Sequence, residues 1–214
     1  MMSASTGSSS IKRAFDLVGA TAALLVLAPP LLMIVALVRI FLGFPILFRQ
    51  SRPGWHGQLF TCLKFRTMTD ARDAEGRLLP DAERMTAFGR LLRGSSIDEL
   101  PELINVIRGE MSLVGPRPLL PQYLARYTPE QMRRHEVRPG ITGWAQVNGR
   151  NRLEWGQKFA LDLWYVDNWS LGLDFRILAR TAWQVFRCHG IAKCAHVTMP
   201  EFFGAAVQRK EGNV

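Results

Sequence analysis

An almost uninterrupted apolar segment occupies residues 14–48 and constrains the fold more than any other feature of the chain. Its sequence is AFDLVGATAALLVLAPPLLMIVALVRIFLGFPILF, and Lys12 and Arg13 precede it. A helix of about 20 apolar residues crosses the hydrocarbon core of a bilayer, so this segment is long enough to do so. A secretory signal shares the basic start, but its apolar region is shorter and ends at a small-residue cleavage site. The segment therefore predicts a membrane element.

Two prolines, Pro29 and Pro30, stand in the middle of this segment. Each removes a backbone donor and crowds the preceding turn, so a helix must bend or break there. Basic residues also flank both sides of the segment: Lys12, Arg13, Arg39, Arg49 and Arg52. The positive-inside rule therefore favours neither direction of crossing. A reentrant hairpin that dips into one leaflet and returns fits the charges, the prolines and Asp16; a straight single-pass anchor is the alternative.

Adjacent carboxylates, Asp98 and Glu99, follow in the motif SSIDELP at residues 95–101. Ser96 and Glu99 have the spacing of a capping box, which would only fix the start of a helix. Pro101 argues for a start nearer to Asp98–Pro101, because proline is tolerated in a first turn only. In either case both acids lie at the positive end of a helix, which favours the ionised carboxylate and attracts anions. An ionised aspartate can attack phosphorus, and capping alone is the alternative role.

Several cations are expected near this acidic pair. Residues 58–68 alternate as a strand that places Lys64 and Arg66 on one face, and residues 69–84 are expected to form a loop. A short helix over residues 85–93 then leads Arg93 towards the acids. Two cations beside a carboxylate pair can hold a diphosphate, although a solvated surface would have the same pattern.

Arg117 stands between two prolines in the sequence GPRP at residues 115–118. Prolines on both sides keep the backbone extended and fix the direction of the side chain. A guanidinium held in this way suits a phosphate or a planar base, whereas the alternative is a turn with an exposed arginine. Residues 137–150 contain three glycines and are expected to form irregular backbone close to a ligand.

The net charge of +9 is compatible with nucleic acid, anionic lipid or a phosphorylated substrate, and the membrane element favours the last two. Three cysteines make no even disulfide framework, and a cytoplasmic location would keep them reduced. Cysteines and histidines cluster near residue 190, but their spacing fits no standard zinc site, and no metal site is predicted there; they are Cys188, His189, Cys194 and His196.

The segment 174–187 has the pattern of a helix lying on anionic lipid. Its apolar positions fall on one helical face: Phe175, Leu178, Ala182, Val185 and Phe186. Arginines occupy the opposite face: Arg176, Arg180 and Arg187. Aromatic residues suited to the headgroup layer stand nearby: Trp155, Trp164, Tyr165, Trp169 and Trp183. An ordinary surface helix packed on the core is the alternative.

These motifs occur together and in a fixed order. Through them the chain resembles the monotopic bacterial phosphoglycosyl transferases, which form the bacterial sugar transferase family. The likeness is greatest to small single-domain members of the PglC type. The matching stretches cover most of the chain. They are FRQSRPG (48–54), LKFRTM (63–68), SIDELPELINVIRGEMSLVGPRPLL (96–120), VRPGITGWAQVNGRN (137–151) and LDLWYVDNWSLGLDFRIL (161–178).

The resemblance implies an α+β fold class, with a small mixed α/β globular domain, an N-terminal reentrant helix-break-helix membrane element and membrane-coplanar amphipathic helices. We expect a disordered N-terminus over 1–10, the reentrant helix over 11–47, the catalytic domain over 48–200 and a tail over 201–214. The expected location is the cytoplasmic face of the bacterial inner membrane. One departure concerns the helix break, which is often Ser-Pro in the family and is Ala28-Pro29 here. The second proline is expected to keep the bend without the serine hydroxyl.

The reaction implied is transfer of a sugar 1-phosphate from a UDP-sugar to undecaprenyl phosphate with release of UMP. By resemblance, Asp98 is the nucleophile that forms a phosphosugar-aspartyl intermediate in a ping-pong sequence, and Glu99 helps to hold Mg²⁺. Residues expected to bind substrate are Lys64, Arg66 and Arg93 for phosphates, Arg117 for the nucleotide and Asp174 in a supporting role. The PglC likeness favours an N-acetylated sugar. The alternative function is a membrane-anchored anion-binding or scaffold protein in which the acids only cap.

Overall fold

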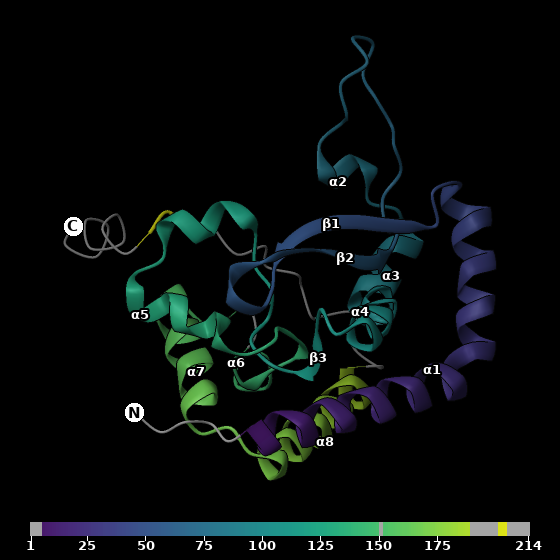
Figure 1. Cartoon of the computed structure of the whole chain (residues 1–214). Helices are drawn as coiled ribbons and strands as arrows, with labels where there is room; N and C mark the ends of the chain where they lie inside the picture. The colour runs from purple at the N-terminus through teal and green to yellow at the C-terminus, as the bar shows by residue number, and fades with distance from the viewer. Residues whose placement is uncertain (1–5, 150–151, 189–200, 205–214) are drawn as a thin grey trace.

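The fold is described from a computed structural model covering residues 6–149, 152–188 and 201–204 (Figure 1). Its helices and strands follow one another in the order α1 (Thr6–Leu42), β1 (Leu47–Pro53), β2 (Leu59–Phe65), α2 (Asp81–Arg84), α3 (Ala87–Gly94), α4 (Glu102–Arg108), β3 (Ser112–Val114), α5 (Pro129–Met132), β4 (Gly140–Thr142), α6 (Trp144–Val147), α7 (Trp155–Asp167) and α8 (Leu171–Cys188). Short 3-10 turns join them: η1 (Trp55–Gly57), η2 (Ile97–Glu99), η3 (Pro121–Arg126) and η4 (Arg133–Glu136). The expected mixture of helices and small sheets is confirmed.

The long helix α1 consists of two arms that meet at a sharp bend (Figure 1). Pro29 and Pro30 lie inside it, so the predicted bend is confirmed, although the helical run continues through the bend instead of breaking. The helix begins at Thr6, within the segment expected to be disordered. It is long and apolar enough from Ser10 to Leu42 to cross a membrane, and most of that stretch is not covered by the rest of the protein. Residues 1–5 lie outside the described part.

The two arms of α1 pack against different parts of the globular domain. On the first arm, Ala20 contacts a buried cluster that includes Leu103 and Val106 of α4. On the second arm, Ile34, Val38 and Leu42 pack with Phe65 and Leu92. The bend thus allows one helix to cover two sides of the domain, because a straight helix cannot reach both clusters.

Strands β1 and β2 form an antiparallel hairpin whose register runs from Leu47 opposite Phe65 to Pro53 opposite Leu59. The predicted strand over residues 58–68 is confirmed, with its ends at Leu59 and Phe65. The side chains of Phe60 and Cys62 are buried on the face that also carries Lys64. Arg66 lies one residue beyond the end of β2.

The segment between β2 and α3 projects from the domain (Figure 1). Residues 69–84, expected to form a loop, contain the short helix α2 and a bridge between Arg72 and Leu78. Helix α3 confirms the short helix predicted there. It approaches the chain after β2 very closely, because a Cβ added to Gly89 would lie 1.8 Å from the carbonyl oxygen of Thr67.

The acidic pair lies in the 3-10 turn η2, directly before α4. The capping box, one of the two alternatives for this motif, does not form, since the side chain of Ser96 caps nothing and its backbone adopts a left-handed conformation with φ of 59°. Helix α4 instead begins at Glu102 with Pro101 at its N-cap, close to the alternative start inferred from the proline. It ends at Gly109, whose positive φ of 83° terminates the helix.

Strands β3 and β4 pair in parallel and hold the segment that carries Arg117. Residues 137–150, expected to be irregular, include β4 and the short helix α6, which corrects that prediction. The physical reason is close backbone packing: a Cβ on Gly140 would lie 2.0 Å from the backbone nitrogen of Gly115. Gly140 therefore allows β4 to pair with the chain at β3 while the two backbones lie very close together.

Helix α8 lies beside the first arm of α1 (Figure 1), with the rings of Phe15 and Phe175 4.9 Å apart. Its buried face carries Leu173, Asp174 and Ile177. The predicted apolar face is divided: Phe175 is 58% exposed, while Leu178 is partly buried against the core. Helices α1 and α8 therefore both leave large apolar side chains exposed, as a membrane-facing surface would.

Two of the aromatic residues expected in a headgroup layer belong instead to the core. Trp155 packs with Tyr123, Phe159 and Phe202, and Tyr165 is 1% exposed, so that expectation is wrong for both. Trp183 is 63% exposed and remains available to lipid. Phe202 belongs to the expected C-terminal tail, of which residues 205–214 lie outside the described part, as do His189, Cys194 and His196.

Candidate active site

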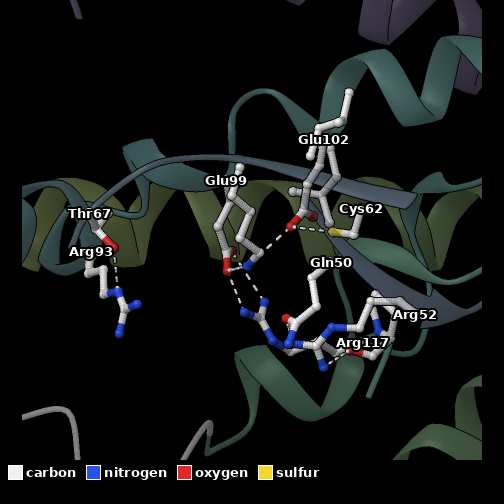
Figure 2. A network of polar contacts seen from close by, with 12 residues as sticks. Gln50, Arg52, Cys62, Thr67, Arg93, Glu99, Glu102 and Arg117 are labelled. Carbon is white, nitrogen blue, oxygen red and sulfur yellow. Dashed lines mark hydrogen bonds and ion pairs between the residues drawn. The ribbon is translucent and has the colours of Figure 1, made fainter. Parts of the chain in front are cut away.

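Glu99 stands at the centre of a cluster of opposite charges (Figure 2). Lys64 Nζ lies 2.6 Å from Glu99 Oε1. Arg117 donates to both carboxylate oxygens of Glu99, with Nη1 3.2 Å from Oε2 and Nη2 on Oε1. Strand β2, turn η2 and the segment after β3 each supply one of these residues. The predicted meeting of cations and acids is therefore present in the fold.

Asp98 precedes Glu99 in the same turn, and its side chain is buried, with 8% of the residue exposed. Arg93 approaches from α3, where its Nε donates to Thr67 Oγ1 at 2.9 Å. The close contact at Gly89 determines how near α3, and hence Arg93, comes to the acids. Asp98, Glu99, Lys64, Arg93 and Arg117 are thus gathered in one site, as predicted.

The two neighbouring acids have opposite acidities. Burial, together with the adjacent Glu99, raises the pKa of Asp98 to about 6, although Lys64, Arg93 and Arg117 act against this. Burial also opposes ionisation of Glu99, but Arg117 and Lys64 outweigh it and hold its pKa well below the usual range. Neighbouring carboxylates whose pKa values are separated in this way commonly have different chemical roles. Glu99 is a permanent anion, whereas Asp98 changes charge near pH 6.

Arg66 and Asp174 do not join this site. Arg66 donates to the backbone oxygens of Phe44 and Met68 and pairs with Asp70 at 2.6 Å, because it lies past the end of β2. The expectation that its side chain points the same way as that of Lys64 is therefore not met.

Asp174 is buried where α8 crosses the start of α1. It pairs with Lys12 at 2.9 Å and accepts hydrogen bonds from Tyr165 at 2.8 Å and Trp169 at 3.2 Å. Lys12 also pairs with Asp16, which accepts hydrogen bonds from residues 112 and 113 of β3. Asp174 thus fastens α8 to α1. Its ion pair and hydrogen bonds join it to Lys12, Tyr165 and Trp169 and not to the acidic pair, so the expectation that it lies near the site is wrong.

Three residues that line the site were not predicted from the sequence, and two of them are Glu102 and Cys62. Glu102 Oε1 lies 3.2 Å from Lys64 Nζ and accepts a hydrogen bond from Cys62 Sγ at 3.4 Å. Burial raises the pKa of Glu102 and raises that of Cys62 to about 12. The alternation of β2 already places Cys62 beside Lys64, which was an available signal. The sequence did not distinguish Glu102 as a site residue, because acidic residues are common in the first turn of a helix.

Arg52 is the third such residue, and it borders a small, open hollow beside the acidic pair. The other lining residues are Cys62, Lys64, Glu102, Arg117 and Pro118. The β1–β2 register places Arg52 opposite Phe60, and therefore on the same sheet face as Lys64. This relation requires the pairing of the strands, so neither strand shows it alone.

The donor set suits a magnesium ion bound together with a substrate. Among the described residues, no group of three or more His, Cys, Asp or Glu side chains could form a metal cage. Mg²⁺ commonly takes one or two carboxylates and completes its shell with water and substrate phosphates. Glu99 is an ionised carboxylate next to Asp98, so it fits this kind of site.

Several known proteins similar to this chain are named as sugar transferases or sugar phosphotransferases. Residues 7–188 match the family model described as bacterial sugar transferase. The uncharacterized sugar transferase EpsL of Bacillus subtilis (strain 168) is 55% identical over 195 residues, which cover 91% of this chain and 96% of EpsL. The exopolysaccharide production protein ExoY of Rhizobium meliloti (strain 1021) is 41% identical over 187 residues, covering 79% and 83%. The UDP-glucose:undecaprenyl-phosphate glucose-1-phosphate transferase of Caulobacter vibrioides is 42% identical over 181 residues, covering 79% and 67%.

The raised pKa of Asp98 generates a prediction for stability. In the unfolded chain this carboxyl ionises near pH 3.8, but in the folded protein it ionises near pH 6, so ionisation above that pH costs folding free energy. Asp98→Asn should therefore unfold at a higher temperature than the wild type at pH 8, with a gain on the order of 1–3 kcal/mol.

This gain should shrink as the pH falls from 6 to 4, since the wild-type carboxyl then becomes protonated in the folded state while the unfolded chain approaches its own pKa of 3.8. Thermal unfolding in detergent, measured from pH 4 to 8, tests the sign. Asp81→Asn, which changes a largely exposed acid, is the control. An Asp98→Asn protein that is less stable than the wild type at pH 8 would contradict the electrostatic account.

Proposed function

The chain belongs to the bacterial sugar transferase family and is a phosphoglycosyl transferase, and we propose that it transfers a sugar 1-phosphate from a UDP-sugar to undecaprenyl phosphate. The products are UMP and undecaprenyl-diphosphate-sugar. The name of the Caulobacter relative describes a reaction of this kind, which supports the donor and the acceptor. The observation that carries the proposal is the buried Asp98 beside the Glu99–Lys64–Arg117 cluster. Membership of an enzyme family removes support for the scaffold alternative.

In the proposed first step, a carboxylate oxygen of Asp98 attacks the sugar-linked phosphorus of the donor. A bond from aspartyl oxygen to phosphorus forms, the bond from phosphorus to the bridging oxygen breaks, and UMP leaves with that oxygen. Asp98 must be ionised for this attack, and its pKa of about 6 leaves it mostly ionised at neutral pH. Its burial also removes the water shell that would otherwise stabilise the carboxylate.

In the proposed second step, a phosphate oxygen of undecaprenyl phosphate attacks the same phosphorus. The aspartyl bond breaks, Asp98 is released as a carboxylate, and undecaprenyl-diphosphate-sugar forms. Two displacements at one carboxylate make the sequence ping-pong. Lys64, Arg93 and Arg117 offer cationic donors to phosphate oxygens, and Arg117 can bind two oxygens of one phosphate with its planar guanidinium.

Lys64 and Arg117 are held on Glu99 in this structure, so the same two cations are already positioned when a diphosphate arrives. Glu99 is proposed to hold Mg²⁺ together with the donor. When bound, the ion neutralises part of the diphosphate charge and stabilises the departing phosphate. A donor sugar with an N-acetyl group remains a proposal based on family resemblance, and the Caulobacter relative is named for glucose.

The proposed topology is monotopic, with α1 reentering the cytoplasmic leaflet of the inner membrane. It is supported by the bend of α1, by the exposed apolar side chains of both arms and by the position of α8 beside the first arm. Both ends of α1 would then lie on the cytoplasmic side, where Arg39 meets anionic headgroups.

Nucleotide release tests the proposed reaction directly. Detergent-solubilised wild-type protein with Mg²⁺, undecaprenyl phosphate and a panel of UDP-sugars, N-acetylated and not, should release UMP. Asp98→Asn should reduce the rate at least about a thousandfold, because the nucleophile is lost. Asp81→Asn should keep the wild-type rate. Release of UDP would indicate simple glycosyl transfer, and an active Asp98→Asn would reject the nucleophile.

The metal assignment predicts a separate effect at Glu99. Glu99→Gln keeps a similar size but removes the negative charge, so the Mg²⁺ concentration for half-maximal UMP release should rise about tenfold or more. Initial rates over a range of Mg²⁺ concentrations measure this shift. An unchanged Mg²⁺ requirement in a folded Glu99→Gln variant would place the ion elsewhere.

Cysteine labelling tests the topology. In a background with Cys188 and Cys194 replaced by serine, cysteines placed at Ser5 and at Gly57 should react with a membrane-impermeant reagent from the same side of inverted vesicles. Cys62 is buried and should stay unlabelled. Val26→Cys is the matched control, since Val26 is 76% exposed in the protein and only lipid can protect it. Labelling of the two ends from opposite sides would establish a spanning helix.

A further inference from the structure

Arg52 supplies a positive charge in the hollow beside the acidic pair. Its guanidinium donates to Gln50 Oε1 at 2.6 Å and to the carbonyl oxygen of Pro118 at 3.4 Å, and both partners are neutral. Among the ion pairs formed by the described residues, none includes Arg52. Lys64 and Arg117, by contrast, are paired with carboxylates. The hollow therefore keeps a cation whose charge the surrounding residues do not neutralise.

The position of Arg52 next to Arg117 makes this charge unfavourable without an anion (Figure 2). Burial and the nearby Arg117 lower the pKa of Arg52. Glu102 is the one carboxylate that lines the hollow with Arg52, Lys64 and Arg117, and it already contacts Lys64. A phosphate between the two guanidiniums would replace their repulsion by charge-assisted hydrogen bonds.

The hollow and Arg93 lie on opposite sides of Glu99 (Figure 2). Arg93 belongs to α3, whose Leu92 packs against the second arm of α1, so this side adjoins the membrane element. The start of β1 packs there too. Arg52 is five residues beyond Leu47, which corresponds to about 17 Å along an extended strand. A lipid-linked phosphate that enters along the second arm of α1 meets Arg93 first, and the hollow is left for the other phosphate.

Lys64 and Arg117 connect the acidic pair to Arg52, since both act electrostatically on Asp98 and both line the hollow that Arg52 borders. In a displacement at phosphorus the leaving group departs on the side opposite to the nucleophile. With the sugar-linked phosphate held at Lys64 and Arg117, the leaving phosphate is directed towards Arg52.

We propose that the hollow bordered by Arg52, Lys64, Arg117 and Glu102 is a subsite for the nucleotide-side phosphate of the donor, and that Arg52 is a further phosphate-binding residue. The proposal rests on the proposed function for the identity of the nucleotide. It assigns the phosphates of the donor and of the lipid acceptor to different sides of Glu99.

Equilibrium binding of UMP and of uridine to the full-length protein in detergent tests this subsite, because the two probes differ only by the phosphate. The wild type should bind UMP more tightly than uridine. Arg52→Gln should weaken UMP binding about tenfold or more and leave uridine binding unchanged, while Arg52→Lys should lie between the two. Arg49→Gln is the matched control: the same change on an exposed arginine of the same strand, expected to have no effect.

Thermal unfolding establishes that each variant is folded. If Arg52→Gln does not fold, the binding comparison is made with Arg52→Lys instead. Equal wild-type affinities for UMP and uridine, unchanged UMP binding by a folded Arg52→Gln, or an equal loss for both probes would overturn the subsite. A raised KM for undecaprenyl phosphate with intact UMP binding would assign Arg52 to the acceptor and also overturn it. Failure of the proposed function is distinguishable, because it appears as missing UMP release by the wild type.

Discussion

The pairing of the Glu99 carboxylate with Lys64 and Arg117 is the interaction on which the rest of the site depends. A buried carboxylate is costly unless cations and hydrogen bonds compensate for lost hydration. Here that compensation comes from β2 and from the segment after β3, so the ion pairs hold three separate parts of the chain together. The same contacts keep two cations in place for a diphosphate and leave Asp98, whose own charge is poorly compensated, with a raised pKa.

A second set of buried charges connects the membrane element to the same site. Lys12 on α1 pairs with Asp16 and Asp174, and Asp16 accepts hydrogen bonds from β3. Because β3 leads directly into the segment that carries Arg117, the position of α1 and the position of this guanidinium are mechanically linked. The opposite arm of α1 packs on α3, which carries Arg93. Helix α1 is therefore a structural component of the site as well as a membrane element.

Local physical chemistry explains which predictions succeeded. Proline cannot continue a straight helix, so the bend in α1 followed from Pro29 and Pro30. Alternation of apolar residues identified β2. The capping box does not form because Ser96 adopts a left-handed backbone. Helix propensity could not predict the 3-10 turn that follows, because tertiary packing imposes it. The aromatic residues show the same limitation, since an isolated Trp155 looks equally suited to lipid and to a core.

The sequence by itself determined the membrane element, the acidic pair and the supply of cations, because these depend on apolar length, proline and residue type. Tertiary structure decided which cations meet the acids. Lys64 and Arg66 are two residues apart, yet only Lys64 reaches Glu99, since β2 ends before Arg66. Arg52 joins them only through the β1–β2 register. Charge and periodicity are local properties of a chain, whereas ion pairs and pKa values depend on distance and burial, which packing alone establishes.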